Sequence, residues 1–105
     1  MIPKVTEKKP SECSSIAELR SEIDRLDKTI VGLLGERFGY VKEVVNYKER
    51  TAKGIEASDR RTSMMVDRRQ WAQAEGLDPD VIESLFGQLV EYFIAEEKKQ
   101  VGIKN

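Results

Sequence analysis

The first half of the chain carries hydrophobic residues at alternating intervals of three and four, the spacing of one face of an α-helix. This pattern predicts a helix from about residue 16 to about residue 48, roughly 50 Å long at 1.5 Å per residue. A compact monomer of this size has a radius of gyration of about 13 Å, so the helix needs a second chain to cover its stripe. We therefore expect an intertwined homodimer. The stripe consists of Ile16, Leu19, Ile23, Leu26, Ile30, Leu33, Tyr40 and Val44.

The start of this helix is marked by a polar segment and a capping signal. Residues 1–14 are polar and contain two prolines, which predicts a flexible N-terminal tail. Ser14 or Ser15 can cap the helix, and Glu18 follows Ser15 at the spacing of a capping box. The helical domain is therefore expected to span residues 15–101.

A second helix is expected after a loop at residues 50–57. Ser58 or Asp59 can cap it, and it should run from about residue 60 to residue 75. Gly76 is placed to end it.

A third helix should begin at Asp78 and Pro79, because proline suits the first helical turn. It extends to about residue 100, and its apolar face then meets a charge, Glu97, where a hydrophobic residue is expected. The chain shows no strand pattern, so the fold class is all-α: three helices with one long N-terminal helix.

The composition restricts the possible chemistry. The 105 residues suffice for one domain, and the net charge of −1 disfavours a nucleic-acid surface. Histidine is absent and Cys13 is the only cysteine, so histidine relays, disulfides and the common zinc sites are excluded. No apolar run is long enough to span a membrane. We expect a cytoplasmic protein without a metal or cofactor.

Arg37 interrupts the apolar stripe of the first helix. A buried guanidinium is costly unless it is neutralised. Lys48 follows 11 residues later, which places the two cations within about 20° of each other on one helix face. Arg60 follows the loop, Arg20 could reach in from a partner chain, and Glu97 lies opposite. These cations predict a small ligand with more than one carboxylate.

A simpler interpretation is as plausible from periodicity alone. Arg37 and Glu97 could form a buried salt bridge, or fix the register of the helices without any ligand. Lys48 and Arg60 could each be solvated residues near helix ends.

At these positions the chain resembles the all-helical chorismate mutases. The order and spacing of the matching segments carry the resemblance, which covers about residues 12–100. Residues 10–13, 40–42 and 94–96 further resemble the isochorismate pyruvate lyase branch. The segments shared with the mutases are residues 18–27, 34–37, 41–42, 47–48, 59–60 and 85–89.

The resemblance implies a dimer of the chorismate mutase II type and a role for each candidate residue. Arg37, Lys48 and Arg60 would bind the substrate within one protomer, and Arg20 would come from the other. Position 97 would hold a hydrogen-bond donor to the ether oxygen. The rearrangement of chorismate to prephenate is pericyclic, so positioning and electrostatic stabilisation suffice for catalysis.

Two residues depart from the family pattern. Family members often have glutamine where this chain has Glu97, and only a protonated Glu97 could donate a hydrogen bond. Activity should therefore fall as pH rises. Arg61 stands where typical mutases have a glutamate that contacts the substrate hydroxyl and where the lyase has an apolar residue. Arg61 is thus a candidate substrate-binding residue that bears on which isomer is recognised.

The sequence as a whole predicts a chorismate mutase with Arg37, Lys48 and Glu97 as catalytic residues. Its substrate-binding set is Arg20, Arg37, Lys48, Arg60 and Arg61. One alternative is an isochorismate pyruvate lyase, which releases salicylate and pyruvate. The other is a non-catalytic helical dimerisation module.

Overall fold

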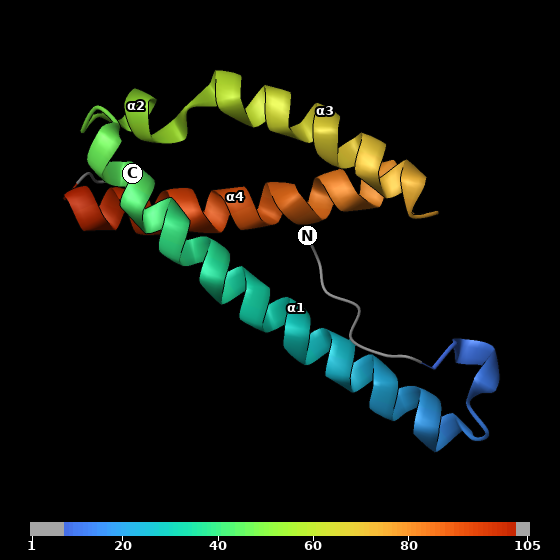
Figure 1. Cartoon of the computed structure of the whole chain (residues 1–105). Helices are drawn as coiled ribbons and strands as arrows, with labels where there is room; N and C mark the ends of the chain where they lie inside the picture. The colour runs from blue at the N-terminus through green and yellow to red at the C-terminus, as the bar shows by residue number, and fades with distance from the viewer. Residues whose placement is uncertain (1–7, 103–105) are drawn as a thin grey trace. The chain divides into compact units, whose positions relative to one another are not determined.

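The structure, a computed structural model, describes residues 8–102, and all regular elements in this range are helical. The chain divides into two compact units, one ending at Gly39 and the other beginning at Tyr40. The all-α class and the three long helices are confirmed (Figure 1). In chain order the elements are η1 (Pro10–Glu12), α1 (Ile16–Val44), η2 (Val45–Tyr47), α2 (Ala52–Glu56), α3 (Ser58–Ala74) and α4 (Pro79–Val101).

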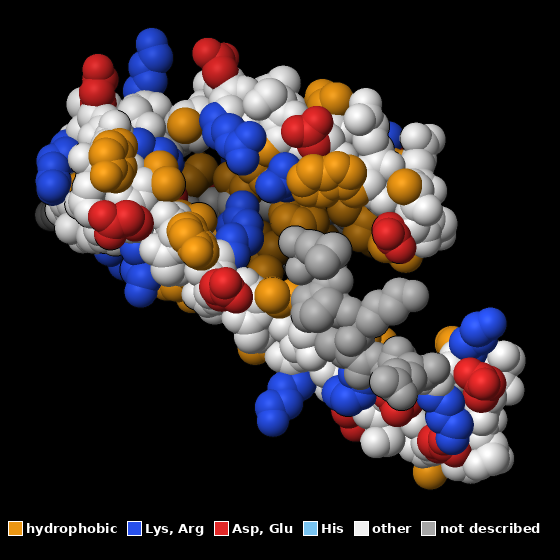
Figure 2. Space-filling model, viewed as in Figure 1, with side chains coloured by type: hydrophobic (Ala, Val, Ile, Leu, Met, Phe, Trp, Pro, Cys, Tyr) orange, Lys and Arg blue, Asp and Glu red, His pale blue; other side chains and the backbone are white. Residues whose placement is uncertain are grey.

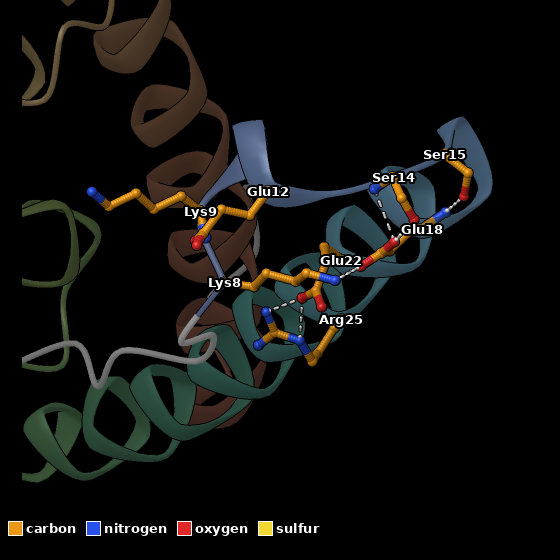
Figure 3. A network of polar contacts seen from close by, with 8 residues as sticks. All are labelled: Lys8, Lys9, Glu12, Ser14, Ser15, Glu18, Glu22 and Arg25. Carbon is orange, nitrogen blue, oxygen red and sulfur yellow. Dashed lines mark hydrogen bonds and ion pairs between the residues drawn. The ribbon is translucent and has the colours of Figure 1, made fainter.

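A polar network caps the start of α1 (Figure 3). The Ser15 hydroxyl accepts a 3.1 Å hydrogen bond from the Glu18 backbone N–H, as the capping pattern predicts. The Glu18 carboxylate turns back to accept bonds from the Ser14 N–H at 3.0 Å and the Ser14 hydroxyl at 2.8 Å, and it pairs with Lys8. These contacts, first the one with Lys8 and then those with Ser14, lower the pKa of Glu18 from 4.5 to about 2.

The segment before this cap contains one ordered turn within the predicted tail. Residues 10–12 form η1, and Glu12 accepts a 2.6 Å hydrogen bond from the Lys9 backbone N–H. Residues 1–7 lie outside the described residues, so flexibility of the tail stays a prediction.

The apolar stripe of α1 is exposed along the helix. Ile16 is 64% exposed, Ile23 54% and Ile30 52%. A helix with an uncovered stripe of this length gains little from burial and is stable only if another surface packs on it. Arg37 is half-buried on the same helix.

The end of α1 differs from the prediction. The α-helix stops at Val44 and tightens into η2, so the helix does not reach Lys48. Lys48 itself has extended backbone, with φ −97° and ψ 152°. Arg37 and Lys48 therefore do not lie on one continuous α-helix, and the predicted shared helix face is wrong, because an angular spacing applies only within such a helix.

The expected loop at residues 50–57 contains a short helix, α2. The Thr51 side chain caps it by accepting a 3.1 Å hydrogen bond from the Gly54 backbone N–H. Ala57 ends it in the left-handed region, at φ 43°. The sequence predicted a loop here, but Thr51 stands at N-cap spacing from Gly54, a local signal that was missed.

The helices α3 and α4 form an antiparallel hairpin in which they run side by side (Figure 1). Ala57, rather than Ser58 or Asp59, occupies the N-cap of α3, so that predicted cap was wrong. At the other end Gly76 has φ 74°, and the N–H of Leu77 bonds to the carbonyl of Ala72 at 2.8 Å, as in a Schellman motif.

The helix α4 begins at Pro79, as predicted, and Asp78 caps it by accepting a 2.9 Å hydrogen bond from the Asp80 backbone N–H. Figure 2 shows hydrophobic side chains at the surface over α3 and α4, with Lys and Arg side chains beside them. Over residues 8–102, no helix combines the length and the apolar character needed to cross a membrane.

Candidate active site

Lys48 is positioned by the turn that follows α1. Val45, which is 1% exposed, anchors η2 in the core, and the Lys48 backbone N–H bonds to the Val45 carbonyl at 3.2 Å. The extended backbone at Lys48 then carries its side chain out of the helical turn. Lys48 is half-buried, so its ammonium lies where contacts with the protein replace part of its hydration.

The Lys48 ammonium makes two hydrogen bonds to the protein. Its Nζ lies 2.9 Å from Glu97 Oε2 on α4 and 2.9 Å from the Ile55 carbonyl oxygen on α2. An ammonium has three N–H donors, so these contacts leave one donor for a bound ligand. The geometry therefore presents a fixed cation with spare hydrogen-bonding capacity.

Glu97 is the buried member of this pair. It is 4% exposed, and no other charged residue among those that the structure describes is buried. A buried carboxylate is tolerated when it is paired and hydrogen-bonded, but such pairs seldom add much stability over apolar residues. Its contact with Lys48 uses Oε2, which leaves Oε1 as the atom that could face a ligand.

The Ile55 carbonyl is held in place by the core of this unit. The Ile55 side chain is 0% exposed and packs with Val45 and Ile94, and Val90 and Val101 pack against this cluster. The same core thus supports η2, α2 and α4, the three elements that supply the contacts of Lys48. Sequence reasoning missed this acceptor, because a backbone carbonyl carries no sequence signal.

Gly54 allows α2 to pack closely against the preceding turn. A Cβ at this position would lie 2.5 Å from the Glu49 carbonyl oxygen and 2.8 Å from its Cβ. Contacts this short do not occur in relaxed structures. Only glycine fits here without a shift of the backbone that leads from Lys48 into α2.

The two arginines at the start of α3 lie in different settings. Arg60 is exposed. Arg61 pairs with Glu91 on α4 and lines an open cavity of about 370 Å³ between α3 and α4, together with Arg69. Glu91 and Glu97 are six residues apart and therefore lie about 120° apart around the helix axis. Arg61 is thus directed to a different side of α4 from the Lys48–Glu97 pair.

Arg20 and Arg37 belong to the first unit, whereas Lys48, Arg60 and Glu97 belong to the second. Arg20 is exposed and Arg37 is half-buried on α1. Their convergence on one ligand stays a prediction, as does the contribution of Arg20 across a dimer interface. Among the candidate residues, the structure brings Lys48 and Glu97 into contact.

No group of three or more potential metal ligands of the His, Cys, Asp and Glu types occurs within residues 8–102. The arrangement around Lys48 offers instead a cation, a buried carboxyl group and a fixed carbonyl. Groups of this kind can bind an anionic ligand and place a hydrogen-bond donor or acceptor beside it.

Comparisons with known proteins identify the class. The family model of chorismate mutase type II matches residues 19–98, so the chain belongs to this family. Over 92 residues the chain is 40% identical to an isochorismate pyruvate lyase of Pseudomonas aeruginosa, an alignment that covers 88% of this chain and 90% of the relative.

Two T-proteins are also similar. The relative in Enterobacter agglomerans is 34% identical over 87 residues, and the one in Haemophilus influenzae is 32% identical over 90 residues. These alignments cover 82% and 86% of this chain but 23% and 24% of the T-proteins. The family suggested by the sequence is thereby confirmed.

Proposed function

We propose that this chain is a chorismate mutase, which rearranges chorismate to prephenate. The observation that carries the proposal is the contact of Lys48 with the buried Glu97 in a member of the chorismate mutase type II family. The reaction is pericyclic and needs no nucleophile. It requires the substrate's folded conformer to be held and the charge that develops on the ether oxygen to be stabilised.

The roles follow from the free hydrogen-bonding capacity of the pair. The remaining N–H of Lys48 would donate to the substrate, and a protonated Glu97 would donate from Oε1 to the ether oxygen while Oε2 keeps its bond to Lys48. Arg37 and Arg60 would bind the carboxylates, with Arg20 supplied by a second copy.

A homodimer is part of the proposal. The exposed stripe of α1 includes Ile16, Ile23 and Ile30, each more than half exposed. Apolar residues at this regular spacing fit a second copy of the same helix. The dimer would cover the stripe and supply Arg20 to the site.

The second candidate function is that of an isochorismate pyruvate lyase, which releases salicylate and pyruvate. It is favoured by the 40% identity that extends over most of both chains. Both reactions are pericyclic and place similar demands on Lys48. The position of the substrate hydroxyl distinguishes the two reactions. Arg61, the residue that the sequence suggested for recognition of this hydroxyl, lies away from the Lys48–Glu97 side of α4.

One experiment separates the candidates. Purified protein is incubated in parallel with chorismate and with isochorismate, and prephenate and salicylate are quantified by chromatography, with salicylate fluorescence as a second readout. Prephenate formation that is lost in Lys48→Met supports the mutase, and salicylate formation supports the lyase.

A non-catalytic module predicts neither product. It also predicts no rise in the melting temperature with a dicarboxylate analogue, because only binding to the native state raises that temperature.

A further inference from the structure

Two adjacent residues of α2 take part in contacts that lead to two adjacent residues of α4. One contact runs through Lys48, and the other is direct. The Ile55 carbonyl bonds to Lys48, which also bonds to Glu97. The next residue of α2, Glu56, accepts a 2.9 Å hydrogen bond from Lys98, the residue after Glu97. The Glu56–Lys98 pair therefore lies one residue along both helices from the contacts of Lys48.

The surroundings of Lys98 differ from those of the neighbouring Lys99. Its side chain is 12% exposed, whereas the side chain of its neighbour Lys99 is 73% exposed. Lys99 pairs with Glu96 on α4 itself, at 3.2 Å, and so does not join two elements. Glu56 is 49% exposed, so the pair is screened by solvent and contributes little to global stability. Its effect is local: it ties α2 to α4.

A helix as short as α2 is not stable by itself, because five residues do not offset the cost of nucleation. Its position depends on the Thr51 cap, the buried Ile55 side chain and the Glu56–Lys98 pair. If α2 moves, the Ile55 carbonyl leaves the Lys48 ammonium. Lys48 then retains Glu97 as its acceptor, and its orientation toward a ligand is less restricted.

We propose that Glu56 and Lys98 are positioning residues, whose ion pair holds the Ile55 carbonyl against Lys48 and so orients this ammonium for an anionic substrate. The inference rests on the proposed function of Lys48 and deepens it. Neither residue needs to contact the substrate. Without the pair, substrate binding must also order α2, and that cost reduces affinity more than the rate of the bound complex.

The kinetic test uses full-length protein and whichever of chorismate and isochorismate the wild type converts. Glu56→Gln and Lys98→Gln should each raise KM about three- to tenfold and change kcat less than about twofold. Lys98→Arg, which keeps the pair, should restore KM. The double variant Glu56→Gln, Lys98→Gln should be no worse than either single variant, because both remove the same interaction. Lys99→Gln is the matched control and should leave KM and kcat unchanged.

A second measurement needs no turnover. Lys53 lies within α2 and is exposed, so tryptic cleavage after it reports opening of this helix. Glu56→Gln should be cleaved there several-fold faster than the wild type, with an unchanged melting temperature. Lys99→Gln should be cleaved at the wild-type rate.

The outcomes distinguish the two proposals. A wild type that converts neither chorismate nor isochorismate overturns the proposed function. An active wild type whose Glu56→Gln variant keeps the same KM and the same cleavage rate at Lys53 overturns the positioning role alone. A loss of kcat with unchanged KM also overturns it, because that result places Glu56 in the chemical step.

Discussion

Lys48 and Glu97 are 49 residues apart in sequence, and their side chains meet at 2.9 Å with the carboxylate buried. The pair joins the end of η2, the turn that follows α1, to the last third of α4. Lys48 also bonds to the Ile55 carbonyl, so this one ammonium connects three elements.

Glu97→Gln and Glu97→Ala should separate a hydrogen-bonding role of position 97 from the loss of its charge. Glutamine keeps an acceptor for Lys48 and supplies an N–H donor for the ether oxygen, so kcat/KM should stay within about tenfold of the wild type. Alanine removes the donor, so kcat/KM should fall by about 10²-fold. Steady-state rates of the two variants at one pH test this, and equal losses in both would refute the role of Glu97.

Lys48→Met should lower kcat/KM by about 10²–10³-fold, because a cation that stabilises developing charge is removed from a partly desolvated site. It should also lower the free energy of unfolding at pH 7 by about 2 kcal/mol, because Glu97 is left buried without its partner. The double variant Lys48→Met, Glu97→Gln should recover that stability but not the activity. Lys99→Met, at an exposed lysine, is the control for loss of charge.

Gly54→Ala should destabilise the protein by about 1–3 kcal/mol, because its Cβ would lie 2.5 Å from the Glu49 carbonyl oxygen. Gly32→Ala is the matched control, since, apart from its chain neighbours and the nearby backbone of its own helix, no atom of the described residues lies within 4 Å of a Cβ there. Alanine is favoured over glycine inside a helix, so this control should be neutral or stabilising by up to about 1 kcal/mol. Urea denaturation of both variants measures the difference, and equal stabilities would contradict the close contact at Gly54.

Acid should weaken the cap of α1. The pKa of Glu18 is lowered from 4.5 to about 2 by Lys8 and Ser14, so its contribution to stability is present above pH 4.5 and is lost as the pH falls toward 2. Glu18→Gln should remove this part of the acid dependence and leave stability lower at neutral pH. Helicity and urea midpoints measured from pH 6 to pH 2, a span of about four units, check the effect. Glu12→Gln, in the preceding turn, serves as the comparison.

A charge on the apolar stripe of α1 should prevent dimerisation. Ile23 is 54% exposed in the single chain, so Ile23→Asp would place a carboxylate in the proposed interface. We expect a monomer by light scattering and a loss of activity, because Arg20 is no longer supplied by a second copy. Lys28→Asp, on the opposite face of the helix, should remain dimeric. A wild type that is monomeric at micromolar concentration would contradict the dimer.

The local features of the chain could be predicted from the sequence because neighbouring residues determine them. The stripe from Ile16 onward predicted α1, Ser15 and Glu18 predicted its cap, and Gly76 predicted the end of α3. The errors concern short segments. The end of α1 at Val44 and the helix α2 depend on the burial of Val45 and Ile55 in a shared core, and such packing overrides weak local preference.

The helical class, the family and the residue types that chemistry without histidine requires could all be predicted from the amino-acid sequence. Which of these residues meet became clear only from the packing of the helices. This packing joined Lys48 to Glu97 and to the Ile55 carbonyl, directed Arg61 to Glu91, and added Glu56 and Lys98 beside the site. The physical reason is that helical periodicity specifies which face a side chain occupies within one helix, whereas contacts between helices depend on how their buried faces pack.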